Sequence, residues 1–167
     1  GFGDEHRAQP LAVSITQSTE LGTLYTADEI RAICAHAHDR DMVVHVDGAR
    51  LSNAAAALGT GFAEFTTAAG VDILTLGGTK NGALGAEAIV VLNPEAAHGL
   101  TYARKFNMQL ASKMRFVSAQ LIALYEGDLW LRSAAHSNAM ATRLRAAVAD
   151  IPGVEFAQPT QANGVFV

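Results

Sequence analysis

Short apolar runs of strand length alternate with stretches of helical periodicity, and this alternation most constrains how the chain can fold. Residues that favour strands fill four such runs, at 11–16, 42–46, 71–76 and 88–92. The run at 42–46 is almost wholly apolar, which is typical of a strand covered on both faces. Helical patterns separate the runs, at 26–40, 51–58 and 62–69. The sequence therefore predicts an α/β fold with a mostly parallel sheet.

The ends of several elements also have recognisable signals. Thr26 to Glu29 matches a capping box, so a helix should begin there, with Cys34 as a small core residue on its apolar face. The segment between the strands predicted at 71–76 and 88–92 is short and Gly-rich, so the strand at 88–92 is either antiparallel or joined by a functional loop. A long amphipathic helix is expected over 99–126, from apolar residues at helical spacing: Leu110, Met114, Val117, Leu121 and Leu124.

The last part of the chain predicts a boundary. A second helix should run to about Asp150, and Ile151 to Gly153 should break it before two short strand-like pieces. We expect residues 1–151 to belong to one domain and 152–167 to begin another. The chain opens at Gly1 without Met and closes in an apolar run, so we expect it to be truncated at both ends.

Composition excludes several classes of protein. The net charge of −4, with no Lys/Arg-rich run, argues against nucleic-acid binding. The apolar stretches are too short to span a membrane. The single Cys34 cannot form an internal disulfide and fits a reducing compartment, which predicts a cytoplasmic protein.

Two unusual polar side chains follow neighbouring predicted strands. Asp47 comes at the end of strand 42–46, and Lys80 follows strand 71–76 between glycines. Ligands of parallel α/β sheets bind beyond the carboxyl ends of the strands. An Asp that keeps a pyridine nitrogen protonated, and a Lys amine that condenses with an aldehyde, are what a pyridoxal phosphate (PLP) site requires. Thr79 is placed to bond the phosphate or the cofactor hydroxyl.

Taken singly, each residue has a more ordinary interpretation. Asp47 resembles a helix N-cap, and a Lys in a Gly-rich turn is usually exposed to solvent. Only their order on adjacent strand ends favours the PLP site. Other sites lack their motifs: residues 77–82 do not have P-loop spacing, His36 and His38 point apart on a helix, and no Gly-x-Ser-x-Gly elbow is present. No metal site is predicted.

Two segments resemble those of a known family. Residues 45–54 (HVDGARLSNA) resemble the HxDGARxxNA signature of threonine aldolases, and residues 76–82 (LGGTKNG), followed by Glu87, resemble the Schiff-base segment of the low-specificity threonine or phenylserine branch. Residues 13–25 and 110–116 are also similar to that branch. The resemblance implies the three-layer large domain of fold-type I PLP enzymes, with 152–167 starting the small domain at a strand near Asn163.

The resemblance also implies roles for individual residues. Asp47 would pair with the pyridine nitrogen, Lys80 would form the Schiff base, and Arg50 would contact the phenolic oxygen. Arg115 matches an Arg near the active site, often that of a neighbouring subunit, in enzymes that are homo-oligomers (dimers or tetramers). Thr19 stands where most of the family has a substrate-contacting His, so the β-hydroxyl base is open, and His45 is a candidate or a satisfied core histidine.

The expected reaction is cleavage of a small β-hydroxy-α-amino acid of the threonine or phenylserine type to glycine and an aldehyde. One alternative is a β-eliminating lyase that uses the same Asp47 and Lys80. The other is an inactive fragment or an α/β interaction module, because the family's phosphate loop and its carboxylate-binding Arg are not among these residues.

Overall fold

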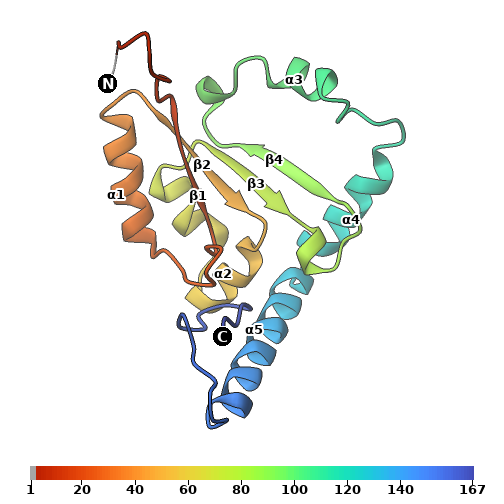
Figure 1. The fold of residues 1–167 in the computed structure, drawn as a ribbon. Helices are drawn as coiled ribbons and strands as arrows, with labels where there is room; N and C mark the ends of the chain where they lie inside the picture. Colours follow the sequence, from red (N-terminus) through yellow and green to blue (C-terminus); the bar gives the residue numbers. More distant parts are fainter. Residues whose placement is uncertain (1–2) are drawn as a thin grey trace.

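A four-stranded sheet organises the fold in the computed structural model, which describes residues 3–167 (Figure 1). Three strands are parallel, and the last is antiparallel to its neighbour. The strands, in spatial as in chain order, are β1 (Ala12–Thr16), β2 (Val43–Gly48), β3 (Ile73–Gly77) and β4 (Glu87–Val91). The predicted α/β class and all four strands are confirmed, and the last strand takes the antiparallel alternative.

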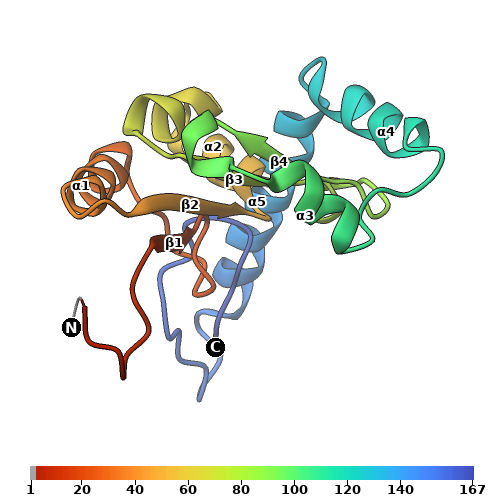
Figure 2. The same cartoon turned by 90° about the horizontal axis from the view of Figure 1, so that it is seen from above.

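One face of the sheet packs on helices. The side chains of Val44, Val46 and Leu74 are buried there, beneath α1 (Ala27–His38) and α2 (Leu51–Leu58). Figure 2 shows both helices on the same side of the sheet. The capping box of Thr26 and Glu29 is present, and Cys34 is buried in this core as predicted. The described residues thus supply the sheet and one helical layer of the expected three-layer fold.

The predicted helix over 62–69 is instead a pair of 3-10 turns, Phe62–Phe65 and Thr67–Ala69. Thr66 separates them with φ −123° and ψ −88°, and its hydroxyl donates to the carbonyl of Phe62 at 2.7 Å. The turns still bury Phe65 and Ala69 in the core. Apolar spacing therefore identified the buried side chains but not the backbone conformation that presents them.

The opposite face of the sheet is polar and partly open. Because side chains alternate along a strand, the register puts Ser14, His45, Asp47 and Thr75 together on this face. On β4 the same face exposes Ile89 by 54%. The prediction that strand 42–46 is buried on both faces is therefore wrong for the part of the chain that the structure describes.

A buried carboxylate at the far end of this sheet bonds to β2, to the segment after β4 and to the last residue of α1. Asp72 accepts from Val44 N at 2.7 Å, from Asn93 Nδ2 at 2.7 Å and from His38 Nε2 at 2.9 Å. Burial by itself raises the pKa of Asp72, but these three hydrogen bonds outweigh burial and hold the pKa below its ordinary value. Burial, followed by the charge of Asp72, raises the pKa of Cys34 to about 11.

The long helix expected over 99–126 is broken in the middle. It forms as α3 (Leu100–Phe106) and α4 (Arg115–Tyr125), with irregular chain between them. Met108 and Lys113 adopt left-handed φ values of 58° and 61°, which an α-helix cannot contain. The helix predicted to follow is confirmed as α5 (Leu129–Val148).

The last residues run back along α5 without forming strands (Figure 1). Arg145 of α5 secures this segment, since its Nη1 donates to the carbonyl of Gln158 at 2.9 Å and its guanidinium lies 3.8 Å from the ring centre of Phe156. The two predicted strand-like pieces do not form, and one backbone bond, from Ala157 N to the carbonyl of Phe166, joins the two parts of this segment. The division into 1–151 and 152–167 stays a prediction, and its first two residues lie outside the described part of the chain.

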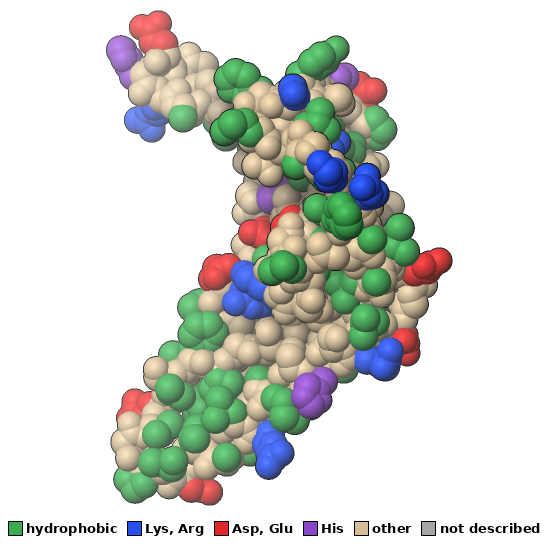
Figure 3. All heavy atoms as spheres, turned by 90° about the vertical axis from the view of Figure 1, so that its right-hand side faces the viewer, with side chains coloured by type: hydrophobic (Ala, Val, Ile, Leu, Met, Phe, Trp, Pro, Cys, Tyr) green, Lys and Arg blue, Asp and Glu red, His purple; other side chains and the backbone are tan. Residues whose placement is uncertain are grey.

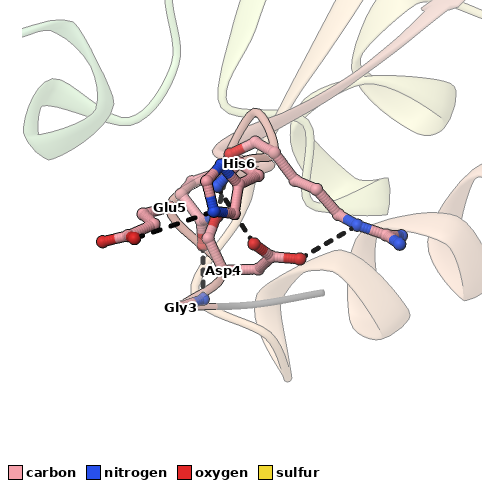
Figure 4. A network of polar contacts seen from close by, with 6 residues as sticks. Gly3, Asp4, Glu5 and His6 are labelled. Carbon is pink, nitrogen blue, oxygen red and sulfur yellow. Dashed lines mark hydrogen bonds and ion pairs between the residues drawn. The ribbon is translucent and has the colours of Figure 1, made fainter.

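The segment that precedes β1 is a local exposed turn. Asp4 pairs with Arg7 Nε at 3.0 Å and accepts from His6 N, and Gly3 N donates to Gln9 Oε1 at 2.7 Å (Figure 4). Exposed pairs of this kind contribute little to stability. Across residues 3–167, no helix has the length and apolar character that a membrane span requires.

Candidate active site

The turns that follow β2 and β3 touch each other. A Cβ on Gly77 would lie 2.8 Å from Ala49 Cα and 3.1 Å from its carbonyl oxygen. A Cβ on Gly48 would lie only 2.5 Å from the carbonyl oxygen of Thr75. These glycines are required because the backbones approach more closely than any side chain permits. The segments that carry Asp47 and Lys80 therefore meet at one end of the sheet, as their order in the sequence predicted.

Asp47 is half-buried on the open face of the sheet. Its Oδ1 accepts from Ala49 N at 2.9 Å, which fixes the carboxylate orientation. In residues 3–167 its Oδ2 has no hydrogen-bond partner, so it is available to a bound N–H group. Thr16 and Thr75 are its register partners on β1 and β3. Asp47 thus presents an oriented acceptor between two short side chains.

His45 lies two residues before Asp47 on the same face, with both ring nitrogens engaged. Its Nδ1 is 2.8 Å from Ser14 Oγ, and its Nε2 is 3.3 Å from Thr75 Oγ1. These contacts make a row of three side chains across β1, β2 and β3. His45 is consequently held in place by hydrogen bonds at both ring nitrogens.

Lys80 lies in a 3-10 turn, Thr79–Asn81, with an exposed side chain. Within the described residues its amine makes no hydrogen bond or ion pair. The turn itself is fixed, because Asn81 Nδ2 donates to the carbonyl of Trp130 at 2.9 Å and Tyr125 Oη donates to the carbonyl of Gly77 at 2.9 Å. Lys80 therefore offers an unpaired amine from an anchored backbone.

The anchors come from residues that sequence analysis did not assign to the site. Burial, chiefly, and the charge of Glu87 raise the pKa of the Tyr125 phenol above its ordinary value. Helix α5 also holds α2, the helix that directly follows the β2 turn, because buried Asn53 donates to Ser137 Oγ at 2.7 Å and to Asn138 Oδ1 at 3.0 Å. Asn53 and Glu87 belong to the two signature segments, whereas the sequence held no signal for Tyr125.

The other predicted residues differ in how they relate to this junction. Arg50 directly follows Ala49 and is half-buried, and within residues 3–167 its guanidinium has no partner. The amide of Thr79 donates to Glu87 Oε1 at 3.2 Å.

Thr19 bonds within its own loop, to Thr23 Oγ1 at 2.7 Å. Arg115 begins α4, and its guanidinium lies 4.9 Å from the ring centre of Phe116. The structure thus brings Asp47, Arg50, Thr79 and Lys80 to one junction, whereas Thr19 and Arg115 have no bond to it.

Metal binding finds no support in the geometry. Across the part of the chain that is described, no three His, Cys, Asp or Glu side chains are grouped so that they could hold an ion.

Comparisons with known proteins agree with this architecture. The chain is 50% identical over 164 residues to a low-specificity L-threonine aldolase of Pseudomonas sp. and 47% identical to one of Pseudomonas aeruginosa. Each match covers 98% of this chain and 47% of the relative, so the chain spans about half the length of these curated relatives. The structure resembles that of a threonine aldolase from Leishmania major with a TM-score of 0.88 and 29% identity, over 97% of this chain and 47% of that one.

The family assignment follows from a match along almost the whole sequence. Residues 2–167 match the beta-eliminating lyase family, and this range contains both of the turns that meet at the candidate site. The chain belongs to the beta-eliminating lyase family.

Proposed function

We propose that this chain forms part of a PLP enzyme that cleaves small β-hydroxy-α-amino acids to glycine and an aldehyde. The observation that carries the proposal is the contact between Ala49 and Gly77, which joins the Asp47 turn to the Lys80 turn. The relatives named low-specificity L-threonine aldolases support the substrate class. The activity is a property of the whole protein, because the relatives are about twice as long as this chain.

The side chains at the junction fit the chemistry of PLP. When bound, PLP withdraws electrons from the α-carbon of an amino acid. Asp47 would accept the pyridine N–H through its unpaired Oδ2, and Lys80 would bind the cofactor aldehyde with its free amine. Arg50, the next residue after the Ala49–Gly77 contact, would bind the phenolic oxygen. Lys80 is then placed to exchange protons with the substrate.

The position of Glu87 narrows the role of Thr79. The amide of Thr79 already donates to the Glu87 carboxylate. A phosphate dianion at the same amide would meet that negative charge at close range, which is unfavourable. We therefore assign Thr79 to the cofactor hydroxyl through its own hydroxyl, and not to the phosphate.

Residues at the edge of the site are proposed to act on the substrate. Thr19 lies in the loop that follows β1, and His45 lies two residues before Asp47 on the same face of β2. Both are therefore candidates for binding or deprotonating the β-hydroxyl group of the substrate. Arg115 is proposed to reach the site of a neighbouring subunit. The C-terminal residues 152–167 are proposed to begin the small domain.

A homo-oligomer is supported by the surface of α3 and α4. Figure 3 shows hydrophobic and basic side chains on the side of the molecule that carries these helices. Tyr102, Phe106 and Phe116 are 81%, 88% and 62% exposed. No Asp or Glu occurs between residues 99 and 125, and the basic residues there are Arg104, Lys105, Lys113 and Arg115.

With Cys34 as its single thiol, the protein is proposed to work in the cytoplasm.

Product analysis tests this function. The full-length protein is incubated with PLP and, separately, L-threonine, L-allo-threonine and L-phenylserine, and glycine and aldehyde are measured. We expect equal amounts of both products, abolished by Lys80→Ala and unaffected by Arg31→Ala, which changes an exposed basic residue of α1. Release of ammonia and a keto acid, without glycine, would instead identify a β-eliminating lyase. Full activity of Lys80→Ala would contradict the proposed site.

A further inference from the structure

The side chain of Glu87 folds over the turn that carries Lys80. Glu87 is the first residue of β4, and its Oε1 accepts from Thr79 N at 3.2 Å. Thr79 immediately precedes Lys80 in the same 3-10 turn. A hydrogen bond to a carboxylate is stronger than one between neutral groups. The carboxylate is therefore bonded to the backbone one residue away from the reactive amine.

Strand pairing directs Glu87 to this position. Glu87 is the register partner of Gly77, so both lie on the open face of the sheet that also carries Asp47 and Thr75. The absence of a side chain on Gly77 makes room for the carboxylate, since a Cβ there would lie 3.0 Å from Glu87 Oε2. Both carboxylate oxygens thus lie against the turn, one at the Thr79 amide and one above Gly77.

The hydrogen bond from the Thr79 amide is the main polar interaction of Glu87. Within residues 3–167 Glu87 forms no ion pair, although its side chain is exposed. An exposed glutamate without such a partner ordinarily samples many rotamers. Tyr125 holds the carbonyl of Gly77 at 2.9 Å, from a different part of the turn. The turn is consequently held by groups on three elements, β4, α4 and α5.

We propose that Glu87 is a positioning residue, which fixes the backbone of Thr79 so that the Lys80 amine is presented toward the open face beside Asp47. The effect on cofactor attachment rests on the proposed function, whereas the effect on the turn does not. Glu87 acts through the backbone and touches no reacting atom. Glutamine at this position would keep the acceptor for Thr79, and alanine would remove it.

Hydrogen exchange of the cofactor-free protein tests the contact directly. Exchange of the Thr79 amide is measured by NMR or fragment-resolved mass spectrometry, with the amides of α2 as an internal reference for global stability. Glu87→Ala should accelerate Thr79 exchange by about fivefold, the factor expected for one hydrogen bond. Glu87→Gln should stay closer to the parent protein than to Glu87→Ala. The matched control is Glu95→Ala, which removes an exposed glutamate that lies 3.3 Å from His98.

Cofactor attachment gives the second measurement, in the full-length protein. The rate at which PLP becomes linked to Lys80 should fall in Glu87→Ala and recover in Glu87→Gln. Unchanged Thr79 exchange in Glu87→Ala, or a Glu87→Gln protein that behaves as Glu87→Ala does, would overturn the positioning role. Failure of the parent protein itself to attach PLP would overturn the proposed function, while the exchange data would still decide whether Glu87 orders the turn.

Discussion

Replacing Gly77 with Ala tests whether the two turns must touch. The new Cβ would lie 2.8 Å from Ala49 Cα, 3.0 Å from Glu87 Oε2 and 3.1 Å from the Ala49 carbonyl oxygen. Carbon atoms pack best at about 3.5–4.0 Å, so the turns would have to separate by about 1 Å. Two of the three contacts are with backbone atoms, which cannot rotate away as a side chain can.

The magnitude follows from two opposing terms. Overpacking of this kind costs about 1–3 kcal/mol. Replacing Gly with Ala also restricts the unfolded chain, which stabilises the protein by about 0.4–1 kcal/mol where the backbone allows it. We therefore expect Gly77→Ala to lower the free energy of unfolding by about 1–2 kcal/mol. Since the separation occurs between Asp47 and Lys80, cofactor attachment should also weaken.

Urea denaturation followed by circular dichroism measures this loss against a matched control. Gly61→Ala introduces a Cβ with nothing within 4 Å, at φ −76°, so it should be neutral or slightly stabilising. A Gly77→Ala protein as stable as Gly61→Ala, with unchanged attachment of PLP, would refute the claim that the turns are in enforced contact.

Three further predictions concern the surrounding structure. Since the pKa of Asp72 is lowered in the folded state, its stabilising effect should be full above about pH 4 and fade as the pH falls through the folded pKa. The difference in free energy of unfolding between the parent and Asp72→Asn, measured in urea, should therefore shrink as the pH falls. A difference that stays constant with pH would contradict this. Asn53→Ala should lower the free energy of unfolding by about 1–3 kcal/mol, because it removes the buried amide that bonds two half-buried side chains of α5. A loss below about 0.5 kcal/mol would show that these bonds do not hold α2 against α5. Cys34, buried and with a pKa of about 11, should react with maleimide only after unfolding, and fast labelling of the native protein would contradict its core position.

Sequence patterns predicted the strands well because each is a short apolar run with clear boundaries. They also placed Asp47 and Lys80 at one end of the sheet, because parallel neighbours share their carboxyl ends. The break in the helix over 99–126 could not be predicted in this way. Apolar spacing continues through it, while the left-handed Met108 and Lys113 carry side chains that usually avoid such a conformation.

The supports of the site depend on contacts that lie far apart in the sequence. Tyr125 bonds Gly77 across 48 residues, and Asn53 bonds Asn138 across 85. No local pattern encodes such pairs. The polar face of β2 was also missed, since His45 and Asp47 are only two residues in an otherwise apolar run, and their alternation is clear only from the register with β1 and β3. Local sequence thus indicated the proposed reactive groups, and tertiary structure shows which contacts hold the turns that carry them.

The most direct test of the account is to find where PLP attaches. The protein and its full-length form are treated with PLP and borohydride, and each modified lysine is identified by peptide mass spectrometry. The chain has three lysines, so the exposed Lys105 and Lys113 report non-specific labelling in the same sample. We expect Lys80 of the full-length protein to be modified far ahead of the other two at low PLP concentration. Equal modification of Lys80, Lys105 and Lys113 in the full-length protein would contradict a PLP site at the junction of the two turns.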